Sequence, residues 1–422
     1  MTSSFKPHDT NTPGTEGQAQ TKIQKERKHI LFVGESVTLA HVVRPMALAR
    51  TLPPEDYRVT LACDDRYLNL FDALPGDLRP LRTIPSRDFL ENLAKGKAVY
   101  DKSTLRDYVR SDLELLESTQ PDLVVGDFRI SLGISARLCK VPYVTITNAY
   151  WSPYSQLAFP LPEHPITRVL GVGPSEWFFA RLQPMIFARH AQPLNAIRRE
   201  YGLPGLGDSL QKAYTDADLT LYADIPNFVP TTSLPANHQW LGPILWSPHT
   251  PRPDWWDRLP NDRPIVYVAL GSSGDQRILP RILRGLASLP VTVIAATSGR
   301  ALDHVPANTL TADFLPGIKA AARSSLMVCN GGSLSTQQAL AAGVPILGIA
   351  DNMDQHLNMI CIERSGAGKR MRAGQVSPEG VNRLARRLLE DSGHAESART
   401  WAGKMSEHDT GLCFNRQIRS LM

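Results

Sequence analysis

The chain has 422 residues, 42% of them hydrophobic and 21% charged, a composition typical of a globular protein too long for one compact core. Its formal net charge of +5 is slight, and because Lys and Arg are spread along the chain it does not indicate nucleic-acid binding. The five cysteines form no CxxC pair, which excludes a disulfide scaffold and a zinc ribbon and is typical of a reducing compartment.

Residues 1–27 are polar, rich in Thr, Gly and Gln, and lack the apolar stretch of a secretory signal. We expect them to form a disordered N-terminal arm. No apolar run in the chain approaches the ~18 residues that a membrane span needs. The sequence therefore predicts a cytoplasmic protein without a transmembrane segment.

Short apolar runs alternate with helical patterns from residue 28 to residue 245. Runs rich in β-branched residues, too uniformly apolar for half-exposed strands, predict buried strands at 29–34, 57–63, 122–127, 141–148 and 219–224. Helical patterns lie between them, for example at 42–52 and 105–118. Strand–helix alternation with short connections predicts a parallel sheet covered on both faces, that is, a Rossmann-like domain.

The segment 150–215 interrupts this regularity. It concentrates aromatic residues and Met between prolines, as in SEWFFARLQPMIFARHAQPL. One interpretation is a helical insertion that uses these side chains as core. The other is the apolar wall of a substrate pocket, because such pockets are mostly lined by apolar and aromatic side chains. Both interpretations can hold together.

Residues 246–264 contain five prolines and little periodicity, which predicts a linker between two domains. The alternation then resumes, with strands expected at 265–271, 291–297, 325–330 and 344–350 and helices at 281–289, 335–343 and 381–391. We expect a second Rossmann-like domain over 265–405 and a C-terminal helix over 406–422. Two such domains leave a cleft at the carboxyl ends of their strands, where ligands bind.

Residues 329–340, CNGGSLSTQQAL, have the pattern of an anion site. Gly331 and Gly332 permit a tight turn after the strand, Ser333 or Ser335 can cap the following helix, and Gly343 can end it. The free N–H groups of such a helix start suit a phosphate. Many strand–helix turns, however, carry glycine for backbone reasons alone.

From GSSGD (271–275) through FLPG (314–317) and NGGSLSTQQALAAGVP to DQHLN (354–358), the second half resembles the donor-binding domain of GT-B fold nucleotide-sugar glycosyltransferases. These enzymes include the macrolide, plant natural-product and glucuronosyl transferases. The resemblance covers nearly the whole second half, with four motifs in the family's order and spacing. It implies an α/β GT-B architecture of two doubly wound Rossmann-like domains facing each other across a cleft, with the C-terminal helix crossing back onto the first domain.

The resemblance also implies roles for individual residues. Ser272 and Ser273 would lie near the diphosphate, the backbone at Phe314 and Leu315 near the base, and Gly332 and Ser335 at phosphate oxygens; Gln338 would bond the ribose, and Asp354 and Gln355 the sugar hydroxyls. Two positions depart from the family's pattern. Most members have His where this chain has Asn330, so the leaving diphosphate would depend more on the helix N-terminus. Most have Glu where this chain has Gln338, which loses a charge-assisted bond.

In the first half, His41 and the following MALARTL are similar to the family's GHV…LALA pattern, although the loop GESVTLA lacks its usual glycines. The resemblance implies that His41 is the general base and that Asp127 pairs with it. Imidazole suits this role because its ordinary pKa is near neutral pH. Without the resemblance, a lone His at a helix start is more often a cap or a solvent-facing side chain, and Asp127 could equally be a helix N-cap.

These observations predict an inverting, metal-independent glycosyltransferase, that is, a hexosyltransferase. It would move a hexose from a UDP- or dTDP-sugar to a hydroxyl of a small apolar or aromatic acceptor, such as a natural product or a lipid-like molecule. HxxxH, HExxH and DxD spacings in suitable context are missing, so we expect no metal and no cofactor beyond the nucleotide-sugar co-substrate. The alternatives are a nucleotide-sugar 2-epimerase of the same fold and a catalytically silent activator of a transferase. A monomer and a homodimer are both compatible with the sequence.

Overall fold

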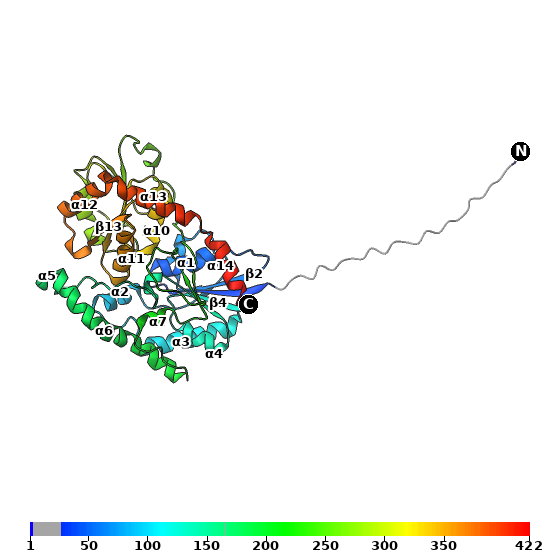
Figure 1. Cartoon of the computed structure of the whole chain (residues 1–422). Coiled ribbons are helices and arrows are strands. Elements are labelled where there is room, and N and C mark those ends of the chain that lie inside the picture. The colour runs from blue at the N-terminus through cyan, green and yellow to red at the C-terminus, as the bar shows by residue number, and fades with distance from the viewer. Residues whose placement is uncertain (3–26, 165) are drawn as a thin grey trace.

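The computed structural model of the protein describes residues 1–2, 27–164 and 166–422 (Figure 1). The predicted N-terminal arm, 1–27, falls almost wholly outside the described residues. The chain that follows forms two parallel β-sheets covered by helices, and each sheet has its own set of helices. The predicted α/β class with two parallel-sheet domains is confirmed.

The first sheet has seven parallel strands in the order β3-β2-β1-β4-β5-β6-β7. Their bounds are β1 (Lys28–Gly34), β2 (Tyr57–Cys63), β3 (Asp77–Pro80), β4 (Leu123–Asp127), β5 (Tyr143–Thr147), β6 (Leu219–Tyr222) and β7 (His238–Trp240). Alternate residues of β1 face two different core clusters, with Ile30 and Phe32 on one side and Leu31 and Val33 on the other. Both faces of the sheet are therefore buried, which explains its continuous apolar strands.

The second sheet has six parallel strands in the order β10-β9-β8-β11-β12-β13. Their bounds are β8 (Ile265–Ala269), β9 (Thr292–Ala296), β10 (Thr309–Ala312), β11 (Leu326–Cys329), β12 (Ile346–Ala350) and β13 (Gly368–Arg372). Val266 and Val268 of β8 face one core cluster, and Tyr267 and Ala269 face another. This sheet is thus also covered on both faces.

Helices lie between the strands in each half of the chain, and three more follow the last strand. Those of the first half are α1 (Leu39–Ala49), α2 (Ser86–Ala94), α3 (Lys102–Thr119), α4 (Leu132–Cys139), α5 (Ile166–Leu170), α6 (Val172–Glu200) and α7 (Leu210–Tyr214). Those of the second half are α8 (Leu279–Leu286), α9 (Gly317–Ala322), α10 (Ser333–Ala341), α11 (Met353–Arg364), α12 (Pro378–Glu390), α13 (Ser392–Ser406) and α14 (Thr410–Arg419). Among the described residues, no helix is both long and apolar enough to span a bilayer.

The proline-rich segment 246–264 passes from β7 to β8 without forming a strand. It is held against the second sheet, because Trp256 is buried in that sheet's core and the Trp255 Nε1–H donates to the Thr311 carbonyl oxygen at 3.2 Å. At the other end of the chain, α14 lies on the first domain (Figure 1). The buried Phe414 packs there beside Phe32, with ring centroids 5.9 Å apart. The chain therefore crosses between the domains twice.

Candidate active site

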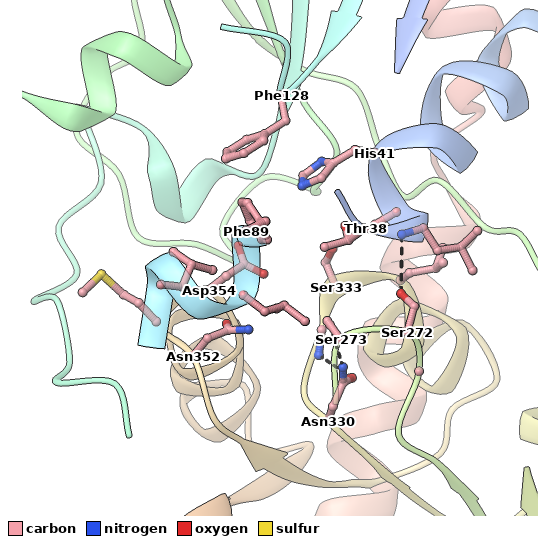
Figure 2. Close-up of a pocket in the computed structure, with 18 of the residues that line it drawn as sticks. Thr38, His41, Phe89, Phe128, Ser272, Ser273, Asn330, Ser333, Asn352 and Asp354 are labelled. Carbon is pink, nitrogen blue, oxygen red and sulfur yellow. Dashed lines mark hydrogen bonds between the residues drawn. The ribbon is translucent and has the colours of Figure 1, made fainter. Parts of the chain in front are cut away.

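A large cavity lies between the two domains, at the carboxyl ends of their central strands. Its volume is about 820 Å³, and side chains of both domains line it. In Figure 2, His41 and Phe128 of the first domain face Ser272, Ser273 and Asn330 of the second. Because ligands of doubly wound folds bind at this edge of the sheet, the cavity is the candidate active site.

His41 lies in the first turn of α1 and faces the cavity. Its Nδ1 is 2.8 Å from Oδ1 of Asp127, the last residue of β4, whose side chain is fully buried. With Nδ1–H donating to the carboxylate, Nε2 is left with a free lone pair, as a general base requires. Asp127 caps no helix here, since α4 starts after Ser131. The structure thus brings the two predicted catalytic residues together.

Phe128 fixes the plane of the His41 ring. The two rings are stacked, with centroids 4.6 Å apart and planes inclined by 11°. Phe128 has a φ of 62°, in the left-handed region that a bulky residue rarely adopts. Observed strain of this kind is often found at functional sites, where the surrounding structure holds it. Here it directs the Phe128 ring onto the imidazole.

Behind His41 and Asp127, a buried chain of polar groups runs along the strand ends. Arg44 donates to both oxygens of Asp127, from Nε at 2.7 Å and from Nη2 at 2.8 Å, and its Nη1 donates to Asn148 Oδ1 at 2.7 Å. Asn148 Nδ2 in turn donates to the carboxylate of Asp224 at 3.2 Å. Burial works to lower the pKa of Arg44, but the Asp127 carboxylate outweighs it and holds that pKa above its usual value. Arg44 therefore stays charged beside Asp127.

On the opposite wall, the N-terminus of α10 points into the cavity. Gly332, Ser333, Leu334 and Ser335 line it, and no side chain caps the helix. The first N–H groups of a helix have no partner within it, so those of this turn are available to a ligand. The expectation that Ser333 or Ser335 caps α10 is wrong: the N-cap position is occupied by Gly332.

The turn that precedes α10 depends on glycine and on Asn330. Gly331 has a φ of 80°, and a Cβ there would lie 2.6 Å from Cγ of Met359. Asn330 Oδ1 accepts from the Gly332 N–H at 3.1 Å, while its Nδ2 donates to Ser273 Oγ at 3.1 Å (Figure 2). The amide thus ties the turn before α10 to the loop after β8.

The remaining predicted donor residues fall into two groups. Ser272, Ser273, Phe314, Leu315 and Asp354 line the cavity together with Asn330, Gly332 and Ser335. Phe314 is 45% exposed, whereas Leu315 is buried. The Asp354 Oδ1 accepts from the Trp151 Nε1–H of the first domain at 2.8 Å.

Gln338, Gln355 and Gly331 are not part of the lining. The Gln338 side chain is buried, and its Nε2 donates to the Trp246 carbonyl oxygen at 2.5 Å. Gln355 is buried at the start of α11, where its Oε1 accepts from the Asp351 N–H at 2.9 Å and completes a capping box with Asn352. In this structure both glutamines hydrogen-bond to the protein backbone. Neither lines the cavity, whereas the sequence predicted that both would contact the donor.

Sequence reasoning did not single out Arg44, Phe128, Asn148, Trp151 or Asp224. A signal was present for two of them, because Asn148 directly follows β5 and Asp224 lies two residues after β6, as Asp127 ends β4. Polar residues at neighbouring strand ends meet at one edge of a parallel sheet. Arg44 carried a weaker signal, since it lies three residues after His41 and so on the same side of α1.

Comparison with known proteins shows the family to which the chain belongs. The chain is 52% identical over 377 residues, 89% of this chain and 88% of the relative, to the "PGL/p-HBAD biosynthesis glycosyltransferase" of Mycobacterium tuberculosis (strain ATCC 25177 / H37Ra). The chain belongs to this glycosyltransferase family. It is also 50% identical over 399 residues, 94% of this chain and 89% of the relative, to the "PGL/p-HBAD biosynthesis rhamnosyltransferase" of Mycobacterium bovis (strain BCG / Pasteur 1173P2).

Two further comparisons agree with this glycosyltransferase assignment. Residues 281–410 match the family described as "Erythromycin biosynthesis protein CIII-like, C-terminal domain". Among solved structures, spinosyn forosaminyltransferase SpnP superposes with a TM-score of 0.68 at 19% identity, covering 94% of this chain and 99% of that one. The spinosyn rhamnosyltransferase SpnG in complex with thymidine diphosphate gives 0.66 at 16% identity, covering 93% and 100%.

These matches confirm the predicted superfamily and the GT-B architecture of this glycosyltransferase. The relatives are named as a glycosyltransferase and a rhamnosyltransferase, which confirms an enzyme of the transferase class. They do not favour the epimerase or the silent activator that the sequence left open.

Proposed function

We propose that this glycosyltransferase inverts the configuration of the transferred sugar, needs no metal, and uses a hydroxyl of an apolar or aromatic molecule as acceptor. One observation carries the proposal: a histidine–carboxylate pair and an uncapped helix N-terminus face the same cavity from opposite domains. The first is suited to remove a proton from an acceptor, and the second to bind the diphosphate of a donor.

In the proposed reaction, His41 Nε2 takes the proton of the acceptor hydroxyl as the oxygen attacks the anomeric carbon. The new C–O bond forms on the face opposite the diphosphate, and the old C–O bond breaks with its electron pair staying on the phosphate oxygen. Asp127 holds the ring through Nδ1 and stabilises the imidazolium that results, following the logic of a catalytic triad. Configuration at the anomeric carbon is thereby inverted.

The leaving diphosphate would be stabilised by the first turn of α10. Its N–H groups and the positive end of the helix dipole oppose the negative charge that develops, and the first turn contains no acidic residue. Ser272 and Ser273 lie on the facing loop after β8 and can donate hydroxyl hydrogen bonds. This arrangement supplies the electrostatic stabilisation that a divalent ion provides in other enzymes, and it is the reason for proposing metal independence.

For the donor we propose a uridine or thymidine diphosphate hexose, with a thymidine diphosphate 6-deoxyhexose as the first candidate. The support is the name of a relative, a rhamnosyltransferase, and a structural neighbour that binds thymidine diphosphate. Asp354, at the start of α11 and on the cavity wall, is the proposed partner of the sugar hydroxyls. Phe314, a partly exposed residue of the cavity lining, is the proposed neighbour of the base.

The acceptor proposal rests on the first domain's share of the lining. A group of aromatic and aliphatic side chains in this lining comes from α2, from the residue after β4 and from α6; they are Phe89, Leu90, Phe128, Phe178, Phe179, Leu182 and Phe187. Such a wall binds an apolar or aromatic molecule through burial of its surface. The 150–215 segment therefore serves both predicted purposes, because Phe179 and Phe187 are buried within α6 packing and also border the cavity.

All five cysteines are free, which supports the proposed cytoplasmic location.

The test is a donor panel with the full chain. Thymidine and uridine diphosphate sugars are incubated with the protein and a water-soluble phenol, with and without EDTA, and the released nucleoside diphosphate and the glycoside are quantified. We expect transfer from at least one donor at the same rate in both buffers. Absence of transfer and of slow hydrolysis with every donor would refute the donor proposal, and loss of activity in EDTA would refute metal independence.

A further inference from the structure

The outer side of α5 and α6 exposes large apolar side chains. Leu170, Trp177, Phe178 and Met185 are 53%, 58%, 49% and 65% exposed. Figure 1 shows α5 and α6 along the outer edge of the molecule. Single exposed apolar residues are common, but four large ones within sixteen positions form a patch of the kind that marks an interaction site. We call Leu170, Trp177, Phe178, Arg181 and Met185 the α6 outer face.

The charges on this face are basic. Trp177, Arg181 and Met185 are spaced four residues apart and so share one stripe of the helix, and the Arg181 guanidinium lies over the Trp177 ring at 3.7 Å. Arg189, two turns further on, is also exposed. Residues 166–190 contain one acidic residue, Glu176, and its Oε1 turns away to Arg372 of the second domain at 3.4 Å. The α6 outer face is therefore apolar, and the exposed charges in the described part of α5 and the first half of α6 are basic.

The chain just before α5 and the inner side of α6 are held by the rest of the protein. Arg372 donates from Nη2 to the carbonyl oxygens of Leu161 and Pro162 at 2.8 and 3.0 Å, and its Nε pairs with Glu163 at 2.7 Å. The buried Phe179 packs inward from α6. These contacts hold the inner side and leave the outer face without a protein partner among the described residues.

The outer face is continuous with the cavity. Phe178 belongs to both, since it is half exposed and also lines the cavity, and Leu182 and Ile186 extend the lining along the next turns of α6. The apolar side chains of the outer face therefore continue through Phe178 into the lining of the cavity. This continuity links the patch to acceptor entry.

We propose that the α6 outer face docks on an anionic lipid surface and that a lipid-anchored acceptor enters the cavity past Phe178. The proposal rests on the proposed function and names the acceptor class of that same site. Trp, Phe and Leu side chains with adjacent Arg are the composition with which helices lie in a membrane interface. Basic charge adds attraction to anionic headgroups, which salt weakens. An apolar protein partner would require no excess of positive charge.

The test is flotation of the full chain with vesicles of phosphatidylcholine, with or without phosphatidylglycerol. We expect the parent protein to float with the anionic vesicles and to be released by salt. The double substitution Trp177→Ser, Met185→Ser should lower the partition coefficient by about tenfold or more, because it removes the apolar contact of the face. Leu412→Ser is the matched control, since Leu412 is 70% exposed on α14, and it should float like the parent.

Trp177 and Met185 do not line the cavity, so the double variant should transfer sugar to a water-soluble phenol at the parent rate. Transfer to a phenol carried on a vesicle-embedded alkyl chain should fall with the partition coefficient. Failure of the parent to float, or equal flotation of the double variant, would overturn the proposal. A parent dimer in sedimentation velocity that the double variant converts to a monomer would overturn it too, by assigning the face to a second copy. Failure of the proposed function is distinct: it would abolish transfer to the soluble phenol while leaving flotation unchanged.

Discussion

Arg44 holds both carboxylate oxygens of Asp127, at 2.7 and 2.8 Å, while Asp127 Oδ1 also lies 2.8 Å from His41 Nδ1. The carboxylate that orients the proposed base is thus shared with a permanent positive charge. A carboxylate whose charge is balanced in this way keeps its geometry, but it stabilises a positive charge on its histidine partner less strongly. We infer that Asp127 acts mainly by positioning the imidazole and fixing its tautomer.

Substituting Arg44 should cost stability as well as turnover. Arg44→Gln leaves the buried Asp127 carboxylate without its countercharge, so the free energy of unfolding should fall by about 3 kcal/mol or more. Arg106→Gln is the control, because Arg106 pairs with Glu200 at the surface and should cost under about 1 kcal/mol. Chemical denaturation of the three proteins measures the difference. Similar values for the two variants would show that the Arg44–Asp127 pair is not structurally important.

Removal of the proposed base should affect turnover alone. We expect His41→Ala to lower kcat by roughly a hundredfold or more, the usual contribution of a general base. His190→Ala serves as control, since His190 also borders the cavity but is bonded to the Gly96 carbonyl oxygen at 3.0 Å. Steady-state kinetics with one donor and a soluble phenol give both values. Parent-like turnover in His41→Ala would remove His41 from the mechanism.

Asp354→Ala should damage recognition of the sugar and spare that of the nucleotide. Loss of charge-assisted hydrogen bonds to the sugar is expected to weaken binding of the nucleotide sugar by roughly ten- to a hundredfold, leaving the free nucleoside diphosphate within about twofold. Titration calorimetry with both ligands checks this. Because Asp354 also accepts from Trp151, Trp151→Phe separates that domain contact from the sugar contact. Equal weakening of both ligands in Asp354→Ala would place the sugar elsewhere.

Asp224 should make stability depend on pH. Burial raises its pKa from 3.8 to about 6, so the folded protein retains a proton that the unfolded chain releases. The contribution of Asp224 to the free energy of unfolding is fully present below the pKa of the unfolded chain. It is lost as pH rises through the pKa of the folded protein, and the total loss is roughly 3 kcal/mol. Asp224→Asn removes the titration, so relative to the parent the variant should gain stability between about pH 4 and about pH 7.

Asp101 provides the contrast of opposite sign. The Thr104 N–H lowers its pKa, so its contribution is present above the unfolded pKa and is lost as pH falls. Asp101→Asn should therefore lose stability relative to the parent as pH rises. Thermal melts of the parent and both variants from about pH 7 down to about pH 3 measure the slopes. Parallel curves for the parent and Asp224→Asn would show that Asp224 does not titrate as described.

The central strands were predictable from the sequence, and three edge strands were not. β1, β4, β5, β8 and β11 are buried on both faces, so each is a continuous apolar run. β3, β7 and β13 lie at sheet edges and read DLRP, HQW and GKRMR. An edge strand has one unpaired side and partial exposure, so polar residues are tolerated and the apolar signal disappears.

Within the site, the residues that could be predicted from the sequence are those that belong to its motifs. The geometry brings His41 to Asp127 and Asn330 to Ser273, although their roles in the reaction remain predictions. Gln338 and Gln355 depart from their predicted roles for a physical reason. The spacing of a motif fixes where a residue lies on a helix, but it does not fix which backbone group the side chain will bind. Gln355 completes a capping box, and Gln338 reaches a carbonyl of the interdomain segment, a contact between residues 92 positions apart.

The most direct test of inverting transfer is the anomeric configuration of the product. The full chain, in EDTA, is given a thymidine or uridine diphosphate hexose of defined configuration and a soluble phenol, and the glycoside is examined by NMR before any hydrolysis. A base at His41 opposite a diphosphate at the α10 N-terminus predicts a glycoside with the configuration opposite to that of the donor. A glycoside that retains the donor's configuration would contradict it.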